Sequence, residues 1–116
     1  MTSDARQLKD YVAIATQYAQ DVVAGRIAAC RWVRLACERH FRDLARAEAG
    51  WVYQFNIELV DVKTGKPYLP AVRVCRFAEL MPHIKGDWAA RGERIRLEPW
   101  QVFVLVSIFG WINRET

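Results

Sequence analysis

The sequence predicts a small domain of the α+β class, mostly helical, with about four helices and a short β-hairpin. Three observations support this class. Apolar residues recur with helical spacing in the first part of the chain, β-branched and aromatic residues nearly alternate over residues 51–62, and prolines precede two later apolar segments. A chain of 116 residues with 53% hydrophobic and 12% aromatic residues can bury a hydrophobic core. We therefore expect a folded unit rather than a disordered chain.

A helical hairpin is expected over residues 4–48. Its first helix follows the apolar positions from Leu8 onward, with Ser3 as the N-cap and Gly25 as the stop. Its second helix covers residues 27–48 and stops at Gly50. The expected core face of this second helix consists of Cys30, Val33, Cys37, Phe41 and Leu44. Since the turn at Gly25-Arg26 is short, the two helices should lie side by side.

A strand-like segment is expected over residues 51–69, and the turn composition of residues 63–67 favours a short hairpin. Pro70 then precedes a third helix over residues 71–81, because proline fits the first turn of a helix and Pro82 cannot continue one. Its apolar face is expected to be Val74, Phe77, Ala78 and Met81, with Arg73, Arg76 and Glu79 in solvent.

The last expected elements are a loop over residues 83–92, a short strand over residues 94–97 and a fourth helix that begins near Pro99 and extends toward residue 111. Glu98 suits the positive N-terminus of that helix. From Trp100 to Phe109 nearly every residue is apolar, so the helix should be buried on most sides. A chain of this length can hardly cover it alone.

Composition narrows the functional classes. The net charge of +4 permits contact with nucleic acid without requiring it. Three cysteines and a polar N-terminus are not typical of a secreted disulfide scaffold. The longest apolar run, residues 102–112, is shorter than the roughly 20 residues that cross a bilayer. We therefore expect a cytoplasmic chain without a transmembrane segment.

A zinc site formed by Cys30, Cys37 and His40, with Cys75 as a fourth ligand, is one interpretation of the cysteine spacing. Structural zinc sites usually take close cysteine pairs from turns, whereas Cys30 and Cys37 share a helix face with apolar residues. We therefore predict core packing and no metal. His83 has no recognisable acid or nucleophile beside it, and we predict a surface residue rather than a general base.

The second helix carries a basic face formed by Arg31, Arg34, Arg39, Arg42 and Arg46. One interpretation is contact with DNA phosphates, for which Arg31, Arg34 and Arg42 are the candidates. The other is a solvated helix face with internal ion pairs such as Glu38 to Arg42, which the mixed charges of this face favour.

Gln101 is nearly alone as a polar residue at the start of the apolar fourth helix. Its carboxamide places a donor beside an acceptor, which matches the N7 and the exocyclic amine of adenine. Gln101 is therefore a candidate adenine reader, and a first-turn glutamine that points into solvent is the alternative.

Five spaced phrases resemble the N-terminal region of the large subunit of tailed-bacteriophage terminases. They are YAQDVVAG (residues 18–25), ACRWVRLACERH (29–40), RFAELMPHIKG (76–86), LEPWQ (97–101) and IFGW (108–111). They occur in the family's order from about Tyr18 to Trp111, with residues 51–69 as the poorest match. The resemblance implies an N-terminal segment of the ATPase domain of a DNA-packaging motor, and the complete domain would belong to the α/β P-loop class.

In this family the large subunit uses ATP with Mg²⁺ to drive double-stranded DNA into procapsids, and a C-terminal nuclease cuts the DNA. The resemblance implies that Gln101 contacts adenine and that Trp100 and Pro99 shape the pocket. The implied partners are the remainder of the large subunit, the terminase small subunit, the portal protein and double-stranded DNA. The implied compartment is the cytoplasm of the host cell.

The sequence contains no G-x-x-x-x-G-K-[ST] phosphate loop, no Walker B strand and no acidic cluster of a two-metal nuclease. We therefore expect no ATP hydrolysis, no DNA cleavage and no tight cofactor binding by this chain alone. If the chain belongs to a truncated or split reading frame, the sequence after Thr116 or a neighbouring frame should encode the missing loop. A stand-alone helical DNA-binding or regulatory module that uses the arginine face is the alternative.

Overall fold

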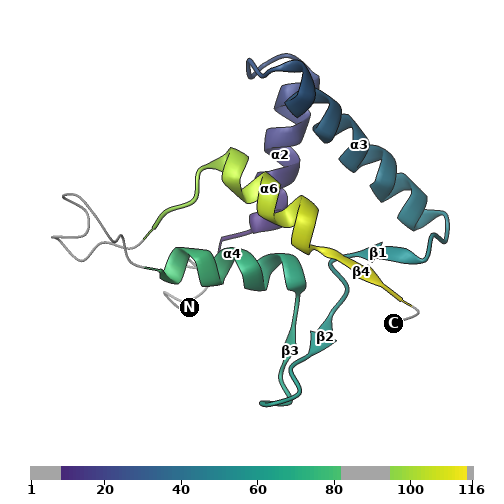
Figure 1. Cartoon of the computed structure of the whole chain (residues 1–116), viewed down its shortest axis with the longest axis vertical. Helices are drawn as coiled ribbons and strands as arrows, with labels where there is room; N and C mark the ends of the chain where they lie inside the picture. Colours follow the sequence, from purple (N-terminus) through teal and green to yellow (C-terminus); the bar gives the residue numbers. More distant parts are fainter. Residues whose placement is uncertain (1–8, 82–94, 115–116) are drawn as a thin grey trace, which may run out of the picture.

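The computed structural model describes residues 9–81 and 95–114 of the chain. Within those residues, four α-helices and four short β-strands follow one another as shown in Figure 1. Their order is α2 (Tyr11–Val23), α3 (Arg31–Glu48), β1 (Tyr53–Phe55), β2 (Leu59–Val60), β3 (Pro67–Tyr68), α4 (Pro70–Leu80), α6 (Pro99–Phe109) and β4 (Trp111–Asn113). The predicted α+β class, mostly helical with a small β component, is confirmed.

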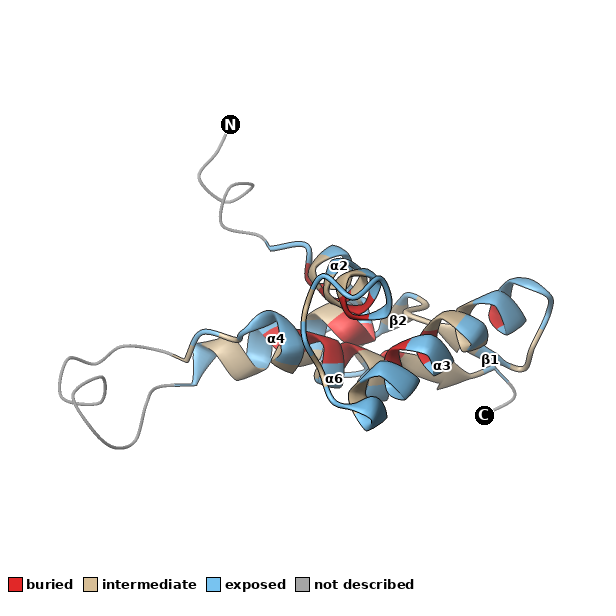
Figure 2. Ribbon diagram, turned by 90° about the horizontal axis from the view of Figure 1, so that it is seen from above, coloured by how far each residue is buried: buried red, intermediate tan, exposed pale blue. Residues whose placement is uncertain are grey.

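Helix α2 lies at the centre of the hydrophobic core. It packs most extensively on α6 and also contacts α3 and α4 (Figure 1). Ala15 and Ala19 of α2 are completely buried, and their small side chains let the neighbouring helices approach closely. The other buried members of the core are Tyr11, Val22, Cys37, Ala71, Cys75, Val102, Phe103 and Val106. These buried residues face the junction of the helices in Figure 2.

Local sequence signals set several helix ends. Gly25 and Gly50 follow α2 and α3 with φ of +82° and +101°, a backbone conformation that favours glycine. Pro70 and Pro99 occupy the first turns of α4 and α6, where the missing N–H costs no helix hydrogen bond. These stop and start positions lie where the sequence predicts them.

The expected start of the second helix is wrong, and the expected N-cap of the first helix is untested. Helix α3 begins at Arg31 rather than at residue 27, because the backbone N–H groups of Arg26 and Ile27 both donate to the Asp21 carbonyl and close off the end of α2. The two helices still pack together, but the connection between them is longer than the predicted Gly25-Arg26 turn. Asp10 is the N-cap of α2 and accepts from the Ala13 N–H at 3.0 Å, whereas Ser3 lies outside the described residues.

The strands form two separate antiparallel pairs. Strands β2 and β3 make the expected hairpin, which projects away from the helices (Figure 1). Strand β1 pairs with β4 so that Phe55 lies opposite Trp111. Sequence patterns did not predict this second pair, because the partner of β1 comes from the far end of the chain.

The predicted strand over residues 94–97 is wrong for its described part. Residues 95–97 have no regular secondary structure. Their backbone groups bond to α4 instead, because the Ile95 N–H donates to the Met81 carbonyl at 2.8 Å and the Leu97 N–H donates to Glu79 Oε2 at 2.9 Å.

The predicted buried face of α4 is also partly wrong. Phe77 is 63% exposed and Met81 is 43% exposed, whereas Ala71 and Cys75 are completely buried. Glu79, which was expected in solvent, has only 14% of its side chain exposed. The helix is therefore rotated relative to the predicted face, and small residues rather than large ones meet the core.

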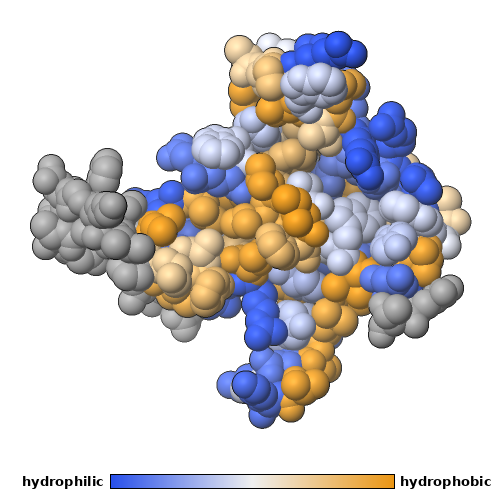
Figure 3. All heavy atoms as spheres, viewed as in Figure 1, coloured by the Kyte–Doolittle hydropathy of each residue, from blue (hydrophilic) through white to orange (hydrophobic). Residues whose placement is uncertain are grey.

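Large apolar side chains remain exposed on α6 and α4. Val104, Ile108 and Phe109 of α6 and Phe77 and Leu80 of α4 are each more than two-fifths exposed. They contribute to the hydrophobic surface seen over these two helices in Figure 3. No helix of the described residues is both long enough and apolar enough to cross a membrane.

Candidate functional site

The first turn of α6 holds the three residues of the predicted adenine element. Glu98 is the N-cap, Pro99 is the first helical residue and Gln101 is the third. Gln101 Oε1 accepts a hydrogen bond from the Glu98 N–H at 2.8 Å, and the Glu98 side chain accepts one from the Gln101 backbone N–H. This reciprocal arrangement is a capping box, which satisfies donors that a helix start leaves unpaired. The carboxamide of Gln101 therefore has a fixed position.

The capping bond leaves Gln101 free to bind a second group. A carbonyl oxygen has two lone pairs, and the bond to Glu98 uses one of them. Within the described residues Nε2 of Gln101 donates no hydrogen bond. One acceptor position and the amide donor consequently remain, a pair whose chemistry matches the exocyclic amine and N7 of an adenine edge.

The surface beside Gln101 is aromatic and open. Trp100 is 53% exposed and Pro99 is exposed as well. An indole face offers stacking area to a purine ring, and proline adds rigid apolar surface. The three residues that the sequence singled out thus lie together on one turn, with the apolar pair accessible from outside.

Glu79 anchors the segment that leads into this turn. Its carboxylate accepts hydrogen bonds from Lys9 Nζ at 2.7 Å, from the Tyr11 hydroxyl at 2.6 Å and from the Leu97 N–H at 2.9 Å. Burial by itself would raise the pKa of Glu79, but these three donors together hold it below its ordinary value. Sequence patterns could not indicate this anchor, because its partners are far apart along the chain.

The candidate DNA-binding arginines lie on a different element. Arg31, Arg34 and Arg42 are exposed along α3, and none of them forms an ion pair with a described residue. Arg31 lies over the Trp32 ring, 5.2 Å from its centroid. The predicted pair of Glu38 with Arg42 is wrong, and the ion pairs of this helix are formed by Asp43 instead.

Asp43 contacts Arg39 at 3.6 Å and Arg46 at 3.7 Å. These two arginines are therefore partly neutralised. The charges of Arg31, Arg34 and Arg42 remain available to an anionic partner.

The residues of the zinc interpretation do not come together. Cys37 and Cys75 are buried in the core, Cys30 is exposed, and His40 is surrounded by Phe41, Phe55, Phe103 and Trp111. Among the described residues no group of three or more histidine, cysteine or acidic side chains is arranged to hold a metal ion. His83 lies outside the described residues.

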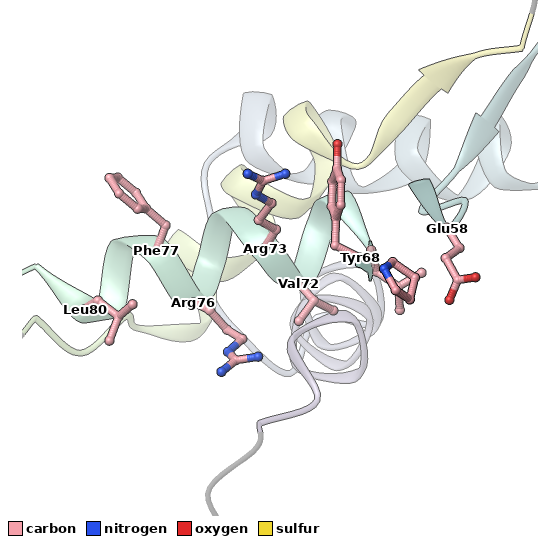
Figure 4. Close-up of a pocket in the computed structure, with 9 residues that line it drawn as sticks. Glu58, Tyr68, Val72, Arg73, Arg76, Phe77 and Leu80 are labelled. Carbon is pink, nitrogen blue, oxygen red and sulfur yellow. The ribbon is translucent and has the colours of Figure 1, made fainter. Parts of the chain in front are cut away.

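A groove that the sequence did not predict lies between α4 and the β2–β3 hairpin (Figure 4). Its volume is about 530 Å³, and Tyr68, Phe77 and Leu80 supply much of its apolar lining. Arg73 stacks over the Tyr68 ring at 4.3 Å and reaches Asp61 at 3.2 Å, so its charge is already engaged.

No protein-family model, curated protein or solved structure matches the chain.

Proposed function

We propose that the chain is the N-terminal segment of the ATPase domain of a terminase large subunit, and that it supplies the adenine-contacting element of a DNA-packaging motor. Five phrases in the family's order support this proposal. The last two of them coincide with the first turn of α6 and with the junction of α6 and β4.

The arrangement of Gln101 is the observation that carries the proposal. Its side chain is fixed by the capping box, yet it keeps a donor and an acceptor for a ligand. A fixed carboxamide loses less conformational entropy on binding than a mobile one. Trp100 and Pro99 beside it provide the surface against which an adenine ring can lie.

In this proposal, catalysis belongs to the remainder of the large subunit. ATP with Mg²⁺ is the proposed cofactor of the complete motor, and the groups that bind phosphates and metal would come from a Walker A loop and a Walker B strand. Contact with the base alone is weak, so we expect adenine to bind this chain only at millimolar concentrations.

The proposed partners follow from the same assignment. The remainder of the large subunit would cover the exposed apolar side chains of α6, since a helix that is apolar on every side is normally buried. The small subunit, the portal protein and double-stranded DNA are the further proposed partners. The host cytoplasm is the proposed compartment.

A stand-alone DNA-binding module is the second candidate function. The observation that favours it is a set of three exposed arginines that form no ion pair with another described residue, Arg31, Arg34 and Arg42. Neutralising three phosphates predicts that the affinity for duplex DNA falls with salt with a slope near −3 in log–log form. Binding at low salt that is unchanged in the Arg31→Ala, Arg34→Ala, Arg42→Ala triple variant would remove this candidate.

The adenine contact is tested by nuclear magnetic resonance of the full chain. Adenosine should shift the side-chain amide of Gln101 and the indole N–H of Trp100 in a saturable way. Inosine should not, because it presents an acceptor in place of the exocyclic amine.

A further inference from the structure

A second cavity lies where α3, the C-terminal end of α6 and the β1–β4 pair meet. Its volume is about 440 Å³, within the usual range of small-molecule sites. Three aromatic side chains line it, Trp51, Tyr53 and Trp111. Arg39, His40 and Asp43 line it from α3, at positions that share one helix face. An apolar cavity with a few convergent polar groups is the usual form of a binding site.

His40 is a buried polar side chain for which the described residues supply no hydrogen-bond partner. It is only 4% exposed, and it makes no hydrogen bond with any described residue. Among the described residues no fully enclosed side-chain nitrogen or oxygen lacks a partner. The ring nitrogens of His40 are therefore not fully enclosed, and His40 is one of the residues that line the cavity.

The protonation state of His40 defines what it can offer. Burial lowers the pKa of His40, although Asp43 opposes the shift, so the imidazole is neutral near pH 7. A neutral imidazole has one donor and one acceptor. Because its ring nitrogens are not fully enclosed, the hydrogen-bond partner that a buried imidazole normally has can be water or a ligand in the cavity.

Asp43 adds a second polar group with unused capacity. Its nitrogen partners on Arg39 and Arg46 lie at 3.6 Å and 3.7 Å, beyond ordinary hydrogen-bond distance. Both carboxylate oxygens can therefore accept hydrogen bonds from a ligand. A cationic ligand is disfavoured, since the Arg46 guanidinium already lies over the Trp51 ring at 4.0 Å.

We propose that this cavity binds a nucleobase with adjacent N–H donors, of which guanine is the best fit. The N1–H and exocyclic amine of guanine can donate to the two oxygens of Asp43, and the aromatic walls give the flat ring a contact surface. The His40 imidazole bonds another polar atom of the base. The Arg39 side chain, three-quarters exposed, lies where the attached phosphate can meet it.

The base has two chemical sources, a free nucleotide and a nucleic-acid strand with unpaired guanines. The cavity is formed by α3, β1, β4 and the end of α6, and the Gln101 turn lies at the opposite end of α6. This inference therefore does not depend on the proposed adenine contact, and each can fail without the other.

The test is a titration of the full chain with guanosine and adenosine 5′-monophosphates and with short guanine-containing and guanine-free single-stranded oligonucleotides. The reporters are the His40 ring protons and the indole N–H groups of Trp51 and Trp111. We expect saturable shifts with guanosine monophosphate and weaker ones with adenosine monophosphate. Tighter binding of the guanine-containing strand would identify nucleic acid as the source, and equal or weaker binding would identify the free nucleotide.

Two variants separate base recognition from phosphate attraction. Asp43→Asn should weaken guanosine monophosphate binding by at least about fivefold, because one bidentate base contact is lost. Simple attraction of phosphate to arginine predicts the opposite, since this variant removes a negative charge. Asp21→Asn is the matched control, because Asp21 is also paired with an arginine but lies on α2 outside the cavity.

His40→Phe keeps a ring in the aromatic cluster and removes the nitrogens. We expect this variant to stay folded, which thermal unfolding measures. It should lose the preference for guanosine over adenosine monophosphate. The proposal is overturned if the wild-type reporters show no saturable shift when the guanosine monophosphate concentration is tenfold above a dissociation constant of about 1 mM. It is also overturned if Asp43→Asn binds guanosine monophosphate as well as wild type does.

Discussion

The hydroxyl of Tyr11, at the start of α2, donates a 2.6 Å hydrogen bond to Oε1 of Glu79, which lies 68 residues away on α4. The other oxygen of Glu79 accepts from Lys9 and from the Leu97 backbone. One half-buried carboxylate therefore joins α2, α4 and the segment that enters α6. This connection places the Gln101 turn relative to the core.

Removing the Tyr11 hydroxyl should destabilise the fold without disturbing its packing. Burial first, and then the contact with Glu79, raise the pKa of Tyr11, so the hydroxyl is a donor at pH 7. The Tyr11→Phe variant should lose about 1.5–3 kcal/mol of unfolding free energy, the usual value of a hydrogen bond to a charged group. Chemical denaturation at pH 7 measures this loss, and a change below 0.5 kcal/mol would contradict the role assigned to this bond.

The stability of the chain should fall in two steps as the pH is lowered. His40 has a lowered pKa in the folded state, so its contribution is lost as the pH falls below about 6.5, the ordinary histidine value. Glu79 also has a lowered pKa when folded, and its contribution is lost as the pH falls below about 4.3. Denaturation midpoints measured from pH 8 to pH 3 test this prediction.

Each step has its own control variant. His40→Phe should flatten the upper step, and Glu79→Gln should reduce the lower one, to which the lowered pKa values of Asp21 and Asp61 also contribute. A stability that rises on acidification would contradict both assignments.

Gly110 is required for space rather than for backbone conformation. Its φ of −82° is available to any residue, but a Cβ there would lie 2.6 Å from both Phe55 Cε1 and the Val106 carbonyl oxygen. Gly110→Ala should therefore cost about 1–3 kcal/mol, as overpacked sites do, and weaken the β1–β4 pair. Gly25→Ala is the matched control, because a Cβ at Gly25 meets no atom within 4 Å. The only cost of this substitution comes from the positive φ. Equal thermal shifts in the two variants would refute the steric argument.

The three cysteines should react at very different rates. Cys30 is exposed, whereas Cys37 and Cys75 are buried. Burial, and then nearby Glu79, raise the pKa of Cys75 to about 11, and burial with Glu38 raises that of Cys37. A disulfide reagent at pH 7 should therefore modify one thiol rapidly in the native chain and all three in denaturant. Rapid modification of all three under native conditions would show that the core is not closed.

Local chemistry explains which parts of the fold the sequence could predict. Pro70, Pro99, Gly25 and Gly50 determine helix ends through their own backbone preferences, so their positions are readable without knowing the fold. The predicted start of α3 was wrong because the N–H groups of Arg26 and Ile27 donate to the Asp21 carbonyl. No residue pattern predicts these two hydrogen bonds.

Long-range relationships explain what the sequence could not predict. The pairing of Phe55 with Trp111 joins distant segments, and the hydrogen bonds of Glu79 on α4 come from Lys9 and Tyr11 near the start of the described chain. Helical periodicity assigned Phe77 to the core because it is apolar. In the structure Phe77 is exposed, and the small residues Ala71 and Cys75 form the buried face of α4. At the candidate site, Gln101 could be identified from its isolation in an apolar helix. Its capping bond to Glu98, and the cavity beside His40, depend on the three-dimensional arrangement of the side chains.

Substitution of Gln101 by glutamate distinguishes the proposed adenine contact of this side chain from its role in capping the helix. Glutamate at the third position of a helix completes a capping box, so Gln101→Glu should change stability by less than about 0.5 kcal/mol. It replaces the Nε2 donor by an oxygen, however, and that oxygen repels N7 of adenine. Neutral nucleosides are the suitable ligands, because the added charge cannot then act on a phosphate.

The decisive measurement is the dissociation constant of adenosine and of inosine for the wild-type chain and for Gln101→Glu, read from the Trp100 indole N–H. The proposal predicts millimolar adenosine binding to wild type, at least about fivefold preference over inosine, and loss of that preference in Gln101→Glu. Equal affinity for the two nucleosides, or an unchanged preference in the glutamate variant, would contradict the assignment of Gln101 as the adenine reader.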